Sequence, residues 1–175
     1  GTPNDDTQKE LVTLALVRMA RTEPTSTLSA IKRFGSGLDR AQQEYVWGII
    51  AWQLGIQHSP EALDAVKRSG TVVLPDDAEA WRVRVALRSQ DWGLVKKTIE
   101  AMPEPMISSP EWVYWLGRAY KAQGRDSAAD EQFQKIAGQP NFYGVSNRID
   151  WSPRRDEHVD LIGAKLRQPA SRGRT

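Results

Sequence analysis

The sequence predicts an all-α protein built as an α-solenoid of stacked helical hairpins. Apolar residues recur at three- and four-residue spacing along most of the chain, as in Leu11, Leu14 and Val17. Alternation typical of strands is nearly absent, and residues 71–74 are the one strand-like stretch. The longer helix of each expected pair begins near residues 7, 39, 77 and 110, so a two-helix unit repeats about every 32 to 38 residues. Hairpins of this size bury their apolar faces by stacking on neighbours, which favours a row of hairpins over a bundle around one centre.

Short connections separate the expected helices, which form four pairs followed by a weaker ninth helix. In chain order the helices are expected at residues 7–21, 25–34, 39–55, 60–69, 77–89, 92–102, 110–123, 127–138 and 142–149. The same spacing recurs in Leu94, Val95 and Ile99 of the helix expected at 92–102.

Helix-start signals agree with these boundaries. The segments 59–61 and 109–111 both read Ser-Pro-Glu, which is an N-cap residue, a proline at the first helical position and an acid in the first turn. Asp76 and Glu79 have the spacing of a capping box. Two further aspartates are expected to cap the short helices that follow them: Asp91 and Asp126.

The last complete unit fits the tetratricopeptide pattern, which makes the expected solenoid a TPR-like superhelix. The matching positions are Leu116, Gly117, Tyr120, Gly124, Ala129, Phe133 and Pro140. Val113 stands at the position where that pattern has tryptophan. Small residues are expected at Gly117 and Ala129 because two helices cross there with their backbones close together.

Composition bounds the classes of function. The 175 residues include no cysteine, 24 Lys and Arg against 22 Asp and Glu, and 39% hydrophobic residues. The lack of cysteine excludes a disulfide scaffold, a zinc site built on thiolates and a thiol nucleophile. No run approaches the roughly 18 apolar residues that a membrane helix requires, so no membrane span is expected.

The chain divides into two parts by charge and pattern. Residues 1–150 are expected to form one TPR-like superhelical domain of four to five helix pairs, and residues 151–175 a basic, partly disordered tail. The tail carries six basic residues against three acidic ones, so the basic balance of the chain comes from it. It contains no element that reads bases, and no nucleic-acid partner is expected.

Few residues or motifs of the sequence indicate catalysis or metal binding. The two histidines, His58 and His158, have no ligand-spaced carboxylates beside them, and neither a phosphate-binding loop nor a nucleophile motif occurs. No catalytic residue, metal site or cofactor is therefore predicted.

A possible glycan-binding or partner-binding surface combines tryptophans with arginines at helical spacing. Its candidate residues are Trp81, Arg82, Arg84, Arg88, Trp112, Trp115 and Arg118. An exposed indole ring can stack on a saccharide, and a guanidinium can bind a carboxylate. Core packing of the tryptophans competes with this interpretation, because they fall in the first helix of a hairpin, which lies between neighbours. An ordinary solvated face likewise competes for the arginines.

A set of short segments is similar to the superhelical region of soluble lytic murein transglycosylases. They are residues 45–48, 62–64, 80–87, 91–92, 99–103, 112–120, 124–125 and 141–144. Among them, Trp-Val-Tyr-Trp at 112–115 and Phe-Tyr-Gly at 142–144 are the most specific. The resemblance covers roughly residues 8–150.

This resemblance implies a U-shaped or ring-shaped helical region that precedes a lysozyme-like domain in a Gram-negative periplasm. That domain cleaves glycan between N-acetylmuramic acid and N-acetylglucosamine and leaves a 1,6-anhydro end. No glutamate of this chain is followed by serine, so the family's catalytic Glu-Ser motif is missing and the chain is expected to be inactive alone. Its partners would be peptidoglycan or a catalytic domain of the parent protein. The start without methionine and the departure from the family after Gly144 suggest a fragment or a truncated gene product.

A TPR-type adaptor that binds a protein or peptide in its groove is the alternative function. Asparagine and lysine on the inner helices would favour it, whereas this chain has tryptophan, valine and arginine there. Comparing capture of protein partners with binding to sacculi would discriminate the two.

Overall fold

A computed structural model describes residues 3–138 of the chain, and within them the protein is all-α. Eight α-helices follow one another with two 3-10 turns and no strand among these residues. The helices are α1 (Pro3–Thr22), α2 (Pro24–Phe34), α3 (Arg40–Ile56), α4 (Ala62–Arg68), α5 (Asp76–Arg88), α6 (Trp92–Glu100), α7 (Pro110–Ala122) and α8 (Asp126–Ile136). The turns are η1 (Gly35–Gly37) and η2 (Met106–Ser108). The expected all-α class is confirmed, while the expected helix at 142–149 and the tail at 151–175 lie outside the described residues.

The observed helix starts confirm one of the predicted aspartate N-caps and contradict two others. Asp91 caps α6 as expected, because its carboxylate accepts a hydrogen bond from Leu94 N at 3.0 Å. The capping box expected at Asp76 is wrong: Pro75 is the N-cap of α5, and the Glu79 carboxylate accepts from Leu74 N instead. Asp126 is also not a cap, because α8 begins at Asp126 itself and Arg125 precedes it as the N-cap.

The two Ser-Pro-Glu segments behave differently from each other. At 109–111, Pro110 is the first residue of α7 and Ser109 is its N-cap. At 59–61, the serine hydroxyl accepts from Glu61 N at 3.2 Å, and α4 begins only at Ala62, two residues later than expected. The same signal therefore gives a helix start in one place and a turn before the helix in the other.

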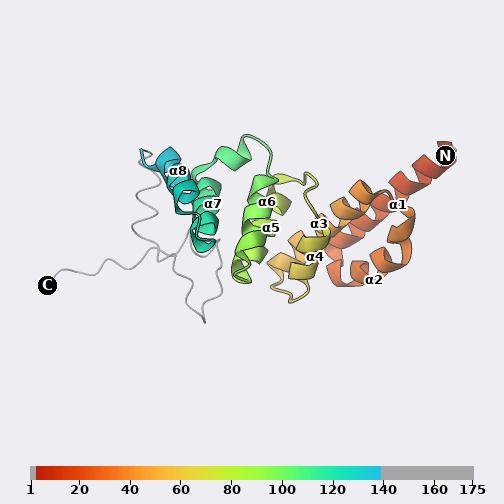
Figure 1. Cartoon of the computed structure of the whole chain (residues 1–175). Coiled ribbons are helices and arrows are strands. Elements are labelled where there is room, and N and C mark those ends of the chain that lie inside the picture. Colours follow the sequence, from red (N-terminus) through yellow and green to blue (C-terminus); the bar gives the residue numbers. More distant parts are fainter. Residues whose placement is uncertain (1–2, 139–175) are drawn as a thin grey trace.

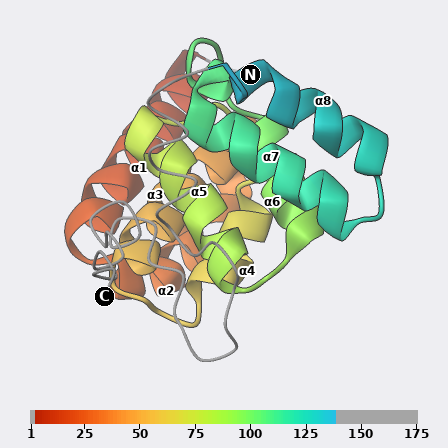
Figure 2. The same cartoon turned by 90° about the vertical axis from the view of Figure 1, so that its left-hand side faces the viewer.

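The helices pack in chain order. The pairs α1 with α2, α3 with α4, α5 with α6, and α7 with α8 lie against each other, and α1 also packs on α3, α3 on α5, and α6 on α7. Figure 1 shows the pairs following one another from α1 at one end to α8 at the other, and Figure 2 views this row from its α7–α8 end. Every extensive contact in the described chain is thus between helices close together in sequence.

Buried apolar side chains run through the row as one cluster. Fully buried members come from successive helices, for example Val46 and Ile50 of α3, Val83 of α5, Ile99 of α6 and Ala119 of α7. Burial of such side chains contributes about 1.5 to 3 kcal/mol each relative to exposure in water. The core is therefore shared between neighbouring pairs and does not belong to any one hairpin.

Glycine allows two close contacts between elements of the fold. A Cβ atom added at Gly117 of α7 would lie 2.5 Å from Cε1 of Phe133 on α8, and one at Gly48 of α3 would lie 2.5 Å from Cδ1 of Leu74. The expectation of a small residue at Gly117 is confirmed by this approach. Ala129 of α8, the other expected small residue, is 1% exposed.

Candidate functional site

Three of the candidate site residues are tryptophans of the helix core. Trp81 of α5 is 7% exposed, and Trp112 and Trp115 of α7 are 3% and 2% exposed. The Trp81 ring also contacts α3, since a Cβ atom at Gly55 would lie 3.2 Å from its Cε3 atom. These rings therefore pack helices together and present no open face on which a saccharide could stack.

Arg82 is a fourth candidate, and it is completely buried. Its Nη2 atom donates to Glu79 Oε2 at 2.7 Å and to Val72 O at 2.8 Å, and Nη1 donates to Gly70 O at 3.2 Å. The other carboxylate oxygen, Glu79 Oε1, accepts from Leu74 N at 2.8 Å. The ion pair holds the connection between α4 and α5 against α5, so Arg82 acts in the fold and not on a surface.

The remaining candidates are three half-buried arginines, two of which lie over aromatic rings. On α5, the Cζ atom of Arg84 lies 5.0 Å from the centroid of the Trp81 ring. On α7, Arg118 lies 5.9 Å from the Tyr114 ring centroid, and its Nη1 atom donates to the Tyr114 hydroxyl at 2.8 Å. Arg88 Nη1 lies 3.5 Å from Gly55 O of α3. Stacking on a ring fixes the plane of a guanidinium group.

Arginine over an aromatic ring recurs along the described chain, which the sequence analysis did not foresee. Besides the Arg84 and Arg118 pairs, such pairs join Arg21 to Trp52, Arg68 to Trp47, Arg33 to Phe34 and Arg125 to Tyr120, with separations of 4.8 to 5.2 Å. The Arg21 and Arg68 pairs join different helices. Only the Arg84 and Arg118 pairs, whose partners lie three and four residues away, had a signal in sequence spacing.

No group of histidine, aspartate and glutamate side chains among residues 3–138 could hold a metal ion, and no helix there is long and apolar enough to cross a membrane. No protein-family model matches the sequence, and comparison with curated proteins gives no significant match.

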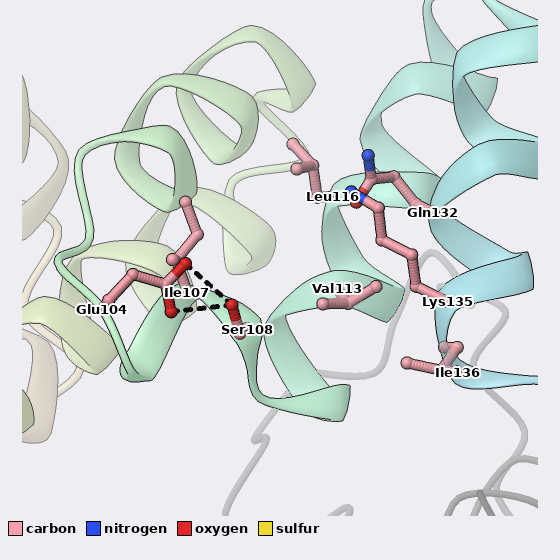
Figure 3. Close-up of a pocket in the computed structure, with 8 residues that line it drawn as sticks. All are labelled: Glu104, Ile107, Ser108, Val113, Leu116, Gln132, Lys135 and Ile136. Carbon is pink, nitrogen blue, oxygen red and sulfur yellow. Dashed lines mark hydrogen bonds between the residues drawn. The ribbon is translucent and has the colours of Figure 1, made fainter.

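A cavity of about 290 Å³ lies where η2, α7 and α8 meet. Figure 3 shows Glu104 and Ser108 on one side of it, Gln132 and Lys135 on the other, and Val113 between them. Ser108 Oγ donates to the Glu104 carboxylate at 2.7 and 2.8 Å, and Lys135 Nζ lies 3.4 Å from Gln132 Oε1. The cavity combines an apolar floor with one acidic and one basic group on its rim. The cavity was not predictable from the sequence, because its lining residues come from η2 and the segment before it, α7 and α8.

The side chain of Tyr120 contacts one acidic group and two cationic groups. Its hydroxyl donates to Glu100 Oε1 of α6 at 3.0 Å, while Arg125 and Lys96 lie over its ring. Partial burial raises the pKa of the Tyr120 hydroxyl, and the hydrogen bond to the Glu100 carboxylate raises that pKa further. The Tyr120 hydroxyl serves as a hydrogen-bond donor between α7 and α6.

Proposed function

We propose that residues 1–150 form a TPR-like α-solenoid that serves as the non-catalytic scaffold of a periplasmic soluble lytic murein transglycosylase. In this role the solenoid binds peptidoglycan and positions it for a lysozyme-like domain of the parent protein. The packing of helix pairs in chain order supports the solenoid, because repeats of this kind contact mainly their neighbours. The resemblance of residues 8–150 to the superhelical region of that family supports the biological setting.

The observation that carries peptidoglycan binding is the pair of ring-supported guanidinium groups on α5 and α7. Arg84 and Arg118 are each held over an aromatic ring of their own helix and remain partly exposed. A guanidinium binds carboxylates through charge-assisted hydrogen bonds, and the stem peptides of peptidoglycan carry carboxylates at regular intervals. Weak contacts on successive helix pairs suit such a repeating polymer, since binding at one position raises the effective concentration at the next.

Binding to purified sacculi tests this role. We expect the Arg84→Gln and Arg118→Gln double variant to bind sacculi about 2- to 30-fold more weakly than the unaltered chain, because each exposed charged contact contributes on the order of 0.2 to 1 kcal/mol. Binding by the unaltered chain should also weaken between low and high salt. Co-sedimentation at two salt concentrations measures both effects.

The matched control replaces two arginines of the same kind elsewhere. Arg33→Gln and Arg68→Gln remove guanidinium groups that also lie over rings, on Phe34 and Trp47. This control should bind sacculi like the unaltered chain. An equal loss of sacculus binding in both double variants would show that net charge alone drives binding. It would contradict the proposal that Arg84 and Arg118 form a specific site.

The scaffold role also predicts that the chain releases no anhydromuropeptides. The sequence contains no glutamate followed by serine, which is the family's catalytic motif. Digestion of purified sacculi, followed by chromatography of the soluble fraction, measures the products. Anhydro-ended products above those of a buffer control would contradict the proposal.

A protein or peptide adaptor is the second candidate function, and the cavity between η2, α7 and α8 favours it. An apolar floor with a carboxylate on one side and an ammonium group on the other suits a peptide that carries both charges. Pull-down from periplasmic extract, compared with sacculus binding at the same two salt concentrations, separates the functions. Capture of a defined protein at both salt concentrations, without sacculus binding, would favour the adaptor.

A further inference from the structure

One side of α1 carries the most exposed large apolar residues of the described chain. Leu11 and Leu14 are each 61% exposed, and they lie three residues apart, on the same side of the helix. Ala15, beside them, is also exposed. The opposite side of α1 holds Leu16 and Ala20, which are 5% and 0% exposed and belong to the shared core.

The position of α1 explains why this side is uncovered. Among the described residues α1 lies at the end of the row of helices, with α2 and α3 packed on its inner side (Figure 1). Two leucines at 61% exposure on the same side of one helix are typical of a surface that a partner covers.

The charges around the leucines define what can cover them. Glu10 and Arg18 lie four residues before and four residues after Leu14, so the three side chains follow one line along the helix. Both charged residues are exposed, and no hydrogen bond or ion pair in the described structure engages either side chain. The surface is therefore acidic at one end, apolar in the middle and basic at the other end.

We propose that this outer face of α1, formed by Glu10, Leu11, Leu14, Ala15 and Arg18, is a homodimer interface. A second copy packs its own α1 antiparallel to the first, across a two-fold axis that passes near Leu14. In this arrangement each Glu10 faces Arg18 of the partner subunit, and the leucines of the two helices meet between the two ion pairs. The interface is isologous, so the same few residues satisfy both copies.

Charge complementarity favours a second copy of the chain as the partner and an antiparallel packing of the two α1 helices. A parallel pairing would place glutamate against glutamate and arginine against arginine, whereas the antiparallel pairing joins opposite charges at both ends. With the axis near Leu14, each Glu10 lies opposite Arg18 of the partner subunit, so the same ion pair forms twice. This inference is independent of the proposed cell-wall function.

Sedimentation equilibrium of the full chain over concentrations up to on the order of 1 mM tests the interface, because small interfaces associate weakly. We expect a monomer–dimer equilibrium. Leu14→Glu should raise the dissociation constant at least about 10-fold, since the substitution acts twice across the axis and sets like charges together. Val73→Glu is the matched control: Val73 is 58% exposed outside α1, and its replacement should leave dimerisation unchanged. Circular dichroism of each variant checks that the helices are intact.

Charge reversal tests the direction of packing. Glu10→Arg alone and Arg18→Glu alone should each weaken the dimer, because each places like charges opposite one another. The double variant E10R/R18E should restore it, because opposite charges then face each other again. A chain that stays monomeric over the whole range overturns the proposal, as does a dimer that Leu14→Glu leaves unchanged. A double reversal no better than the single changes overturns the antiparallel geometry.

Discussion

Replacing Arg82 with methionine is expected to lower the free energy of unfolding by about 3 to 5 kcal/mol, because it leaves the Glu79 carboxylate buried without its cationic partner. Both side chains of this pair are 0% exposed, with 2.7 Å between Arg82 Nη2 and Glu79 Oε2. The arginine also donates to the carbonyl oxygens of Gly70 and Val72, so the substitution frees the connection between α4 and α5 as well. Thermal or urea unfolding followed by circular dichroism measures the loss.

Two further variants separate the buried charge from the lost packing. Adding Glu79→Gln to the Arg82→Met variant removes the unpaired charge but keeps an oxygen that can accept from Leu74 N, so the double variant should be more stable than Arg82→Met alone. Arg68→Met is the control, because Arg68 pairs with Asp64 on the surface of α4, and its loss should cost less than about 1 kcal/mol. Equal losses for Arg82→Met and Arg68→Met would contradict the role given to the buried pair.

The order and bounds of the helices were predictable because they depend on the local spacing of apolar residues, caps and prolines. The expected starts of the helices found in the described residues lie within a few residues of those observed, and the largest difference is at α1, which begins at Pro3 and not at residue 7. Apolar periodicity, caps and prolines act within one or two turns, so a single sequence carries them. The TPR-like superhelix and the family assignment are interpretations of that pattern and stay predictions.

The candidate surface was less predictable because it depends on contacts between elements. Glu79 fits a capping box by its spacing from Asp76, but its carboxylate bonds Leu74 N and Arg82 because of the path of the preceding connection. The spacing that placed Arg82 in a surface series also brings it within reach of Glu79 three residues earlier, and only burial separates the two interpretations. A buried arginine and an exposed one look alike in a sequence.

Replacing Trp112 with alanine is expected to cost about 3 to 5 kcal/mol of stability, because it opens a cavity in the core that α7 shares with its neighbours. Trp112 is 3% exposed, and α7 packs against both α6 and α8. For a chain of this length the loss corresponds to a fall of the unfolding midpoint by roughly 6 to 20 °C. At a temperature where the variant is still folded, its binding to sacculi should equal that of the unaltered chain, since the indole does not contact the ligand.

The comparison that decides between core packing and ligand binding uses a second tryptophan. Trp92, at the start of α6, is only half-buried, so Trp92→Ala should lower the unfolding midpoint less than Trp112→Ala does. Measuring midpoint and sacculus binding on both variants separates the two roles of tryptophan, because a core residue changes the first quantity and a binding residue changes the second. If Trp112→Ala left the unfolding midpoint unchanged and abolished sacculus binding, Trp112 would be a binding residue. That result would contradict the packing described for α7.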